Sequence, residues 1–294
     1  MLLDNSQHIN VKDVLVRAGL DVRSIDKPSS GYASSIFYCN IGGKYFYVSL
    51  LNEERYTVLS LLLQRLGENS FIPIASIEDR GYDKQSENYY LIQTPIAGVS
   101  LNRISLRDSL LREAGEILRK IHSLSLKGYG RLVCSVGEDL RGKFDTWADF
   151  IREQIPLETI NYLSEHGILS VGQSEVIRKT REEVCEMPLV SGSLLHNDYH
   201  RGHIYSDDNG ISGIIDWEAA IVGVAEYDLA MSAHFLGSDF PKLLKGYGSD
   251  VNSEHIQKYE LLIAAHKMVW AHSRHPSKSE TKRSILNAAL SRIV

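Results

Sequence analysis

The chain has 294 residues, of which 43% are hydrophobic and 23% are charged, as in an ordinary folded, water-soluble protein. This composition argues against a disordered, collagen-like or membrane-spanning chain. The 37 acidic and 32 basic residues give a formal net charge of −5, which lacks the basic surplus of nucleic-acid-binding proteins. Three widely spaced cysteines and a start without a basic and apolar leader predict a cytoplasmic protein with neither nucleic acid nor membrane as a partner.

The first part of the chain reads as strands around one helix. Residues 34–40 and 44–51 are aromatic and β-branched, and Gly42-Gly43 between them is typical of a hairpin turn. Apolar residues at three- and four-residue steps predict a helix over 58–66. Further strands are predicted over 71–77 and 89–93. Together these segments indicate a five-stranded antiparallel sheet that holds one helix.

After Gly98 the pattern becomes mostly helical. Amphipathic spacing predicts helices over 110–124, 145–163, 173–186, 241–247 and 254–273. Two short apolar runs, 193–195 and 211–215, lie between them, and each ends in an acidic motif. The change of pattern predicts an α+β protein with a β-rich small lobe over residues 1–94 and a helical large lobe over residues 95–294.

The strongest chemical signal follows the two short apolar runs. The first leads into His196-Asn197-Asp198-Tyr199-His200-Arg201-Gly202-His203-Ile204-Tyr205, and the second into Ile214-Ile215-Asp216-Trp217-Glu218. Asp198 and Asp216 lie 18 residues apart on either side of a predicted hairpin. Phosphoryl transfer needs such a pair, because one carboxylate orients the attacking hydroxyl and the other holds magnesium against the phosphates.

These motifs, with Glu226-Tyr227-Asp228-Leu229-Ala230 downstream, resemble the aminoglycoside phosphotransferase and choline kinase group of the protein-kinase-like fold. Residues 111–124 resemble the first helix of that group's large lobe, and residues 93–101 resemble its inter-lobe hinge. The resemblance implies a two-lobed kinase-like fold that moves the γ-phosphoryl group of ATP or GTP to a small-molecule hydroxyl with Mg²⁺. It places an aminoglycoside-type antibiotic or a related amino sugar or amino alcohol first among acceptors, with homoserine, fructosamines and macrolides open. Antibiotic resistance would be the matching role, for a monomer or a homodimer.

Carried over by position, the resemblance assigns a role to each motif residue. Asp198 would be the catalytic base and Asp216 the main magnesium ligand, and His203 stands where the family usually has an asparagine as second metal ligand. The nucleotide base would meet the Thr94 carbonyl and the Ile96 N–H in the hinge. His196 and Asp228 would support the catalytic loop. The acids Asp145, Asp149 and Glu153 share one helical segment and are candidates for contact with the acceptor.

Ser49 is the main departure from the family pattern. The family has a phosphate-binding lysine at this place on the third strand, and serine supplies no positive charge. Lys44 lies five residues earlier, at a distance of roughly 17 Å along a strand. Glu54 and Arg55 both fit the position of the helix residue that would pair with the lysine. The segment 30–35, with Gly31 among serines, could cover phosphates or form an ordinary hairpin.

Two other functions stay open at this point. The loss of the lysine fits a degenerate kinase-like protein that binds nucleotide without catalysis. His196, His200 and His203 have the i, i+4, i+7 spacing of a zinc site on a helix, as in a zinc-dependent hydrolase. Arg201-Gly202 within this segment favours a loop, in which that spacing carries no meaning.

Overall fold

The computed structural model of the chain describes residues 10–26, 36–134, 139–188, 191–248 and 250–293. It divides into two compact units, Met1–Gly98 with Ser212–Glu218, and Val99–Ile211 with Ala219–Val294. Within the described ranges, no helix combines the length and the apolarity that crossing a membrane requires. The segment 30–35 lies outside the described residues.

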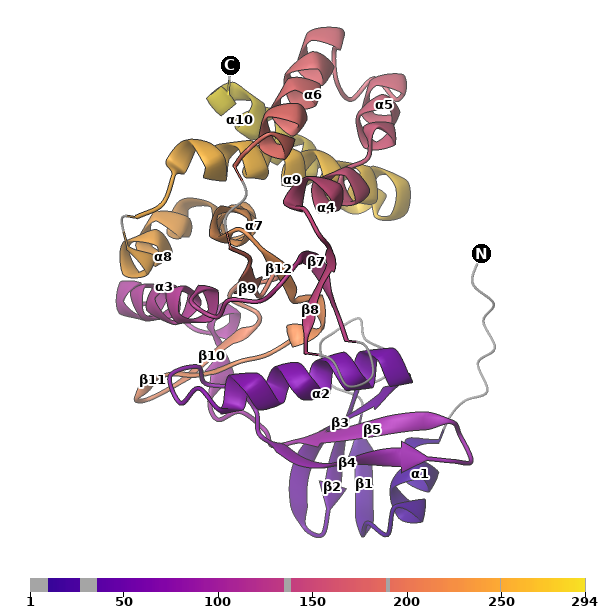
Figure 1. Ribbon diagram of the computed structural model, residues 1–294. Helices are drawn as coiled ribbons and strands as arrows, with labels where there is room; N and C mark the ends of the chain where they lie inside the picture. The colour runs from indigo at the N-terminus through magenta and orange to yellow at the C-terminus, as the bar shows by residue number, and fades with distance from the viewer. Residues whose placement is uncertain (1–9, 27–35, 135–138, 189–190, 249, 294) are drawn as a thin grey trace. The chain divides into compact units, whose positions relative to one another are not determined.

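The first unit is built on a five-stranded antiparallel sheet with the order β1-β2-β3-β5-β4, as the sequence predicts (Figure 1). Its strands are β1 (Val22–Asp26), β2 (Ile36–Ile41), β3 (Lys44–Leu51), β4 (Ile77–Asp83) and β5 (Asn88–Gln93). Helix α1 (Val11–Arg17) precedes the sheet, and α2 (Glu53–Gly67) follows β3.

The two helices cover opposite faces of this sheet. Successive side chains of a strand point to opposite faces of the sheet. Phe46 and Val48 of β3 therefore point to the same face, where they share a buried cluster with Val14 of α1. On the other face, Tyr56 of α2 stacks on Tyr89 of β5 with ring centroids 4.5 Å apart. Ser49 belongs by alternation to this α2 face.

The strand predicted over 71–77 is wrong. The strand at this place is β4, which runs through the polar residues 77–83 instead. It forms the edge of the sheet, and most of its side chains alternate between half-buried and exposed. An edge strand of this kind tolerates polar residues, and for that reason its sequence lacks the apolar pattern of a strand. Pro73 cannot donate a ladder hydrogen bond, and Phe71 is exposed.

The second unit is mostly helical. Its helices are α3 (Asp108–His122), α4 (Trp147–Gln154), α5 (Leu157–Glu165), α6 (Val171–Cys185), α7 (Ala225–Leu236), α8 (Phe240–Tyr247), α9 (Ser253–Arg274) and α10 (Ser279–Ile293), with short 3₁₀ turns at Leu101–Arg103, Gly237–Asp239 and Pro276–Lys278. Helix α9 packs against α7, α6 and α10, and α3 packs against α8. A four-stranded sheet has the order β8-β7-β12-β9, formed by β7 (Tyr129–Val133), β8 (Arg141–Phe144), β9 (Ser193–Leu195) and β12 (Ile221–Gly223).

A three-stranded sheet, with the order β11-β10-β6, follows the predicted hairpin. Its strands are β6 (Val99–Ser100), β10 (Ile204–Asp207) and β11 (Gly210–Ile214). The division between the two units falls inside β11, so residues 212–218 pack with the first unit although the sequence groups them with the second part of the chain. The Ile214 N–H donates to the Pro73 carbonyl at 2.8 Å, which ties the end of β11 to the first unit.

Two helical predictions need correction. The single helix predicted over 145–163 is two helices, α4 and α5, because Pro156 lacks an N–H and disfavours helical backbone at the residue before it. Helix α7 was not predicted. Most of its residues are buried, so it has no polar stripe from which a helical period could be read.

Candidate active site

The motif of residues 196–203 forms a loop between β9 and β10, without helical structure. The helical spacing that suggested a zinc site at His196, His200 and His203 therefore does not apply. Tyr199 fastens the loop to the rest of the unit, because its buried hydroxyl donates to the Ala114 carbonyl of α3 at 2.8 Å. The Ser232 hydroxyl of α7 in turn donates to the Tyr199 carbonyl.

Asp228 of α7 holds the start of this loop through hydrogen bonds. Its fully buried carboxylate accepts the backbone N–H groups of His196 and Asn197, each at 2.8 Å. The Nε2 of His122 lies 3.0 Å from the same carboxylate, and His122 Nδ1 lies 2.9 Å from the Tyr247 hydroxyl. Burial raises the pKa of Tyr247 to about 12, so its O–H remains a donor to the imidazole. Asp228 therefore fixes two successive peptide groups immediately before Asp198.

Asn197 adopts an unusual backbone conformation, with φ 62° in the left-handed region. Its side-chain amide nitrogen donates to the Ala219 carbonyl at 3.0 Å, which fixes the orientation of the amide. The Oδ1 atom is buried and accepts no hydrogen bond from the described residues. It is an acceptor that a water or a bound hydroxyl could satisfy.

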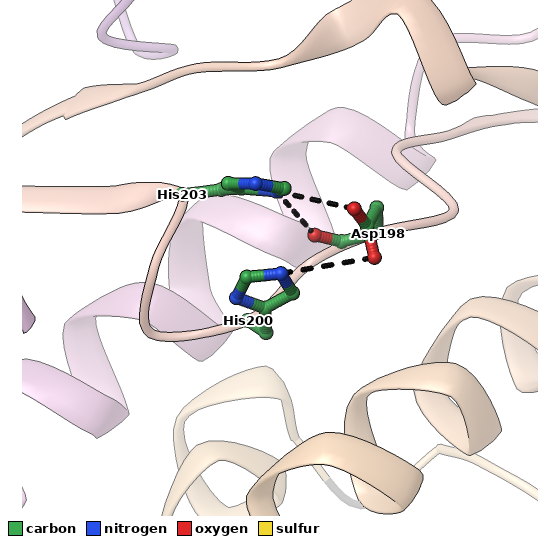
Figure 2. Close-up of side chains that lie close together, drawn as sticks. All are labelled: Asp198, His200 and His203. Carbon is green, nitrogen blue, oxygen red and sulfur yellow. Dashed lines mark hydrogen bonds and ion pairs between the residues drawn. The ribbon is translucent and has the colours of Figure 1, made fainter. Parts of the chain in front are cut away.

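The imidazole rings of His200 and His203 lie together on one side of Asp198, with ring centroids 4.0 Å apart (Figure 2). His203 Nδ1 is 3.0 Å from the Asp198 main-chain carbonyl and 3.4 Å from its Oδ2. A carbonyl oxygen only accepts, so Nδ1 carries the hydrogen. The Gly202 N–H donates to His200 Nδ1 at 2.9 Å, so neutral His200 carries its hydrogen on Nε2, which faces Asp198 Oδ1 at 3.8 Å. Both rings thus turn an N–H toward the same residue and restrict its orientation.

Asp198, His200 and His203 also form a group whose possible ligand atoms lie within 4.8 Å of one another. A metal ion binds the lone pair of an imidazole nitrogen, not its N–H. The lone pair of His200 Nδ1 already accepts from Gly202, and His203 Nδ1 is a donor to Asp198. In this arrangement neutral His200 has no lone pair left for a metal ion, and His203 has only the lone pair of Nε2.

Asp216 lies in the first unit, directly after β11. Its backbone is in the left-handed region, with φ 66°, a conformation that is uncommon outside glycine and that recurs at functional sites. The indole N–H of Trp217 donates to the Ile214 carbonyl at 3.1 Å and closes this turn, which leaves Asp216 exposed.

Glu218 is a second carboxylate beside Asp216. The sequence assigned no role to Glu218. Burial raises the pKa of Glu218, Arg55 of α2 lowers it, and the charge of Asp216 raises it. Arg55 lies 3.8 Å from Glu218 and is mostly exposed. Two carboxylates beside one arginine have a net negative charge. Their oxygen atoms are the ligands that a hard divalent cation prefers.

The hinge residues follow β5. Thr94 is fixed to Ser76, since its N–H donates to the Ser76 carbonyl and its Oγ1 accepts the Ser76 N–H, both at 3.0 Å. Within the described ranges, the Thr94 carbonyl and the Ile96 N–H make no hydrogen bond. Ile96 packs on Gly213, where a Cβ would lie only 2.3 Å from its Cδ1, so any larger residue here would require the Ile96 side chain to move.

Ser49 and Glu54 lie at different levels of exposure. Ser49 is buried in the centre of the sheet, between Ile36 of β2 and Leu91 of β5. Glu54 is exposed in the first turn of α2. Lys44, at the start of β3, is exposed as well.

The fold defined by these two units is the two-lobed α+β protein-kinase-like fold. A thermostable mutant of the aminoglycoside phosphotransferase APH(4)-Ia is similar over 96% of this chain and 98% of that chain, with TM-score 0.73 and 18% identity. A putative fructosamine-3-kinase from Haemophilus somnus 129PT is similar over 96% of each chain, with TM-score 0.63 and 14% identity. The choline kinase LicA from Streptococcus pneumoniae is similar over 96% of this chain and 98% of that chain, with TM-score 0.62 and 16% identity.

The sequence itself identifies the family. Residues 53–262 match the family model APH, described as a phosphotransferase enzyme family, and this range covers more than half of the chain. The chain therefore belongs to the APH phosphotransferase family and is a small-molecule kinase by class. A search of curated proteins gives no match.

Proposed function

We propose that this protein transfers the γ-phosphoryl group of ATP or GTP to a hydroxyl group of a small molecule, with Asp198 as the base. The observation that carries the proposal is the setting of Asp198. Its carboxylate lines a cavity of about 200 Å³ in the second unit, and two imidazole N–H groups face it. A carboxylate fixed beside a cavity can orient a hydroxyl for attack and take its proton.

The acceptor oxygen forms a bond to the γ-phosphorus, and the bond from that phosphorus to the bridging oxygen breaks. The hydroxyl proton passes to Asp198, and the nucleoside diphosphate leaves. His200 and His203 act by holding Asp198, and Asp228 acts by holding the loop that carries it. Positioning of this kind supplies much of the rate in phosphoryl transfer.

We propose that Mg²⁺ is the metal ion of this reaction and that Asp216 is its main ligand. The exposed carboxylate of Asp216, with Glu218 beside it, has the oxygen donors that suit Mg²⁺. When bound, the ion neutralises charge on the phosphates. His203 is assigned as the second ligand by its position in the motif only, and its hydrogen bond to Asp198 limits it to Nε2.

The first unit is proposed to bind the nucleotide and the second the acceptor, with the division near residue 94. The Thr94 carbonyl and the Ile96 N–H would meet the base. Ser49 would stand at the position of the family's phosphate-binding lysine, and Glu54 at that of the helix residue that pairs with this lysine. Complexes of APH(4)-Ia with AMP-PNP and hygromycin B support a nucleotide and a small-molecule acceptor for this chain. By resemblance, amino sugars such as aminoglycoside antibiotics and amino alcohols come first, and a role in antibiotic resistance would follow from the former.

A nucleotide-consumption screen tests the function directly. Purified protein is incubated with Mg²⁺ and either ATP or GTP, across a panel of hydroxyl compounds that are cationic, neutral or anionic. Phosphorylated product identified by mass spectrometry is the expected result for at least one acceptor. Nucleotide binding without product from any compound of the panel would contradict the proposal.

That contrary result would favour the second candidate, a nucleotide-binding protein without catalysis, for which Ser49 is the specific observation. Ser49→Lys would then raise nucleotide affinity, because a lysine restores one charge-assisted phosphate contact of about 1–3 kcal/mol. In an active kinase that uses Arg55 as a substitute cation, Ser49→Lys gives little gain and Arg55→Ala lowers turnover. Wild type, both single variants and the double variant separate these cases.

A further inference from the structure

The cavity beside Asp198 carries an unusual charge for an acceptor site of amino sugars. It lies between the catalytic loop, the end of α4, α7 and α9. The charged and polar side chains that line it are Asp198, Asn197, Gln154, His266 and Lys267; the rest of the lining is Tyr227 and four apolar residues. Asp198 is thus its only carboxylate among the described residues, and Lys267 is a fixed positive charge.

Lys267 is part of a larger basic cluster. Its ammonium lies 5.7 Å from the ring centre of Phe235, and that of Lys282 lies 5.8 Å from the same ring. Phe235 also contacts His200, with ring centroids 4.9 Å apart, so the cluster reaches the residue that faces Asp198. Lys282 donates to the buried His234 Nε2 at 2.7 Å.

No carboxylate neutralises this cluster within the described ranges. Neither Lys267 nor Lys282 forms an ion pair there, whereas Lys143, Lys179, Lys242 and Lys258 of the second unit do. Burial lowers the pKa of Lys282, and the charges of Lys267 and of Lys278 lower it further. Burial and Lys267 likewise lower the pKa of His266. Lys267 and Lys282 thus have no carboxylate partner among the described residues, and such a site is stabilised by an incoming anion.

The acids that would attract a cationic acceptor lie elsewhere or are already paired. Asp145 is bound by Arg141 and Glu153 by Lys143, each at 2.8 Å. Asp149 lies 3.5 Å from Arg152 and lines a different cavity, of about 570 Å³, together with Glu226. That larger cavity includes no residue of the catalytic loop, so a hydroxyl bound there does not meet Asp198.

We propose that the acceptor is a small hydroxyl compound that carries an anionic group, a carboxylate or a phosphate, and that Lys267 binds this group while the hydroxyl faces Asp198. The inference rests on the proposed phosphotransfer and replaces the amino sugar as its expected acceptor. The size of the cavity agrees, because 200 Å³ is below the roughly 300–1,000 Å³ of sites for drug-sized ligands. Asn197 Oδ1, to which no described residue donates, would accept a second hydroxyl or an amine of the same compound.

Matched pairs of acceptors test this class. L-Homoserine is compared with 3-aminopropan-1-ol, D-glycerate with glycerol, and D-glucose 6-phosphate with D-glucose, so that each pair differs by one anionic group. The carboxylate and phosphate arms identify which anion is used, and kanamycin is the cationic comparison. Turnover is measured with Mg²⁺-ATP and Mg²⁺-GTP, and binding of the same compounds is measured by calorimetry without nucleotide.

Lys267→Met is the decisive variant, with Lys267→Arg to retain the charge and Arg283→Met as control. Arg283 is exposed on α10, next to Lys282, so its loss changes the net charge equally. In wild type we expect kcat/KM to be at least about tenfold higher for the anionic member of one pair than for its partner. In Lys267→Met this preference should be lost, because the KM for the anionic acceptor rises by about ten- to a hundredfold. Lys267→Arg and Arg283→Met retain the preference, and the nucleotide KM stays the same in all three.

The outcomes separate the two proposals. Phosphorylation of kanamycin or of the uncharged members, unaffected by Lys267→Met, overturns the anionic acceptor and leaves the phosphotransfer standing. Binding of anionic probes that depends on Lys267, without any turnover, supports the anion site and contradicts the phosphotransfer. A rise in nucleotide KM in Lys267→Met would place the lysine on the nucleotide and overturn the inference. Equal binding of both members of every pair would overturn it as well.

Discussion

Replacing Asp228 with asparagine removes a buried charge while it keeps the shape of the side chain. The carboxylate accepts three hydrogen bonds, from the N–H groups of His196 and Asn197 and from His122. Asparagine has one acceptor oxygen and one donor nitrogen. If its oxygen takes the place of Oδ2, which meets His196 and His122, its NH₂ group faces the N–H of Asn197. Two donors then oppose each other in the buried interior.

The expected cost follows from these contacts. A hydrogen bond to a charged group contributes about 1.5–3 kcal/mol, and a buried donor without a partner costs about 1–3 kcal/mol. Asp228→Asn loses one such bond, weakens two and leaves Asn197 without an acceptor. The free energy of unfolding should fall by about 3–5 kcal/mol, the range for breaking a buried charged network. For a protein of this size that lowers Tm by roughly 10 °C.

Urea and thermal unfolding measure this cost, and turnover with a positive acceptor from the screen measures its consequence. We expect a larger fold-change in kcat than in the nucleotide KM. The variant weakens the hydrogen bonds that hold the peptide groups before Asp198, so the position of the Asp198 carboxylate is less well fixed. Glu226→Gln is the matched control, since it makes the same chemical change two residues earlier in the same turn of α7. A loss of less than about 1 kcal/mol with normal kcat would refute the role of Asp228.

Three further changes have defined outcomes. His203→Asn should keep kcat within about tenfold, because an amide N–H can replace the imidazole N–H that meets the loop carbonyl, and steady-state kinetics would reveal a larger loss that gives the histidine its own role. Gly213→Ala should cost about 1–3 kcal/mol in urea unfolding and weaken nucleotide binding, because its Cβ displaces Ile96, and unchanged stability and affinity would count against this packing. Burial and two neighbouring lysines lower the pKa of His234 to about 3. The unfolded chain takes up this proton near pH 6.5, so stability should fall as pH drops from about 7 to 4, and His234→Gln should reduce that slope; equal slopes in both proteins would contradict the assignment.

Regular periodicity made much of the fold predictable. The hairpin of β2 and β3 joins aromatic and β-branched strands through Gly42-Gly43, and α3 is amphipathic with one buried face; both were found within two residues of their bounds. The edge strand β4 and the buried α7 lack such a pattern. One is polar because solvent reaches it, and the other is apolar on nearly all sides.

The site divides in the same way between local and tertiary information. The motifs place Asp198 and Asp216 at the ends of two short strands, and this much can be read along the chain. The tautomer of His200 depends on a backbone N–H two residues away in a turn that no pattern specifies. Lys267 lies 69 residues after Asp198 and lines the same cavity only because α9 packs against α7, so its presence there could not be predicted from the sequence.

Turnover of Asp198→Asn, compared with wild type, tests the central claim most directly. Asparagine keeps the size of the side chain but cannot take the proton of the acceptor hydroxyl. With the best acceptor of the screen, Mg²⁺ and saturating nucleotide, we expect kcat to fall by a factor of about 10²–10⁴ while Tm and nucleotide affinity stay close to wild type. Wild-type kcat in a folded Asp198→Asn protein would show that another group takes the proton, and the proposed mechanism would be wrong.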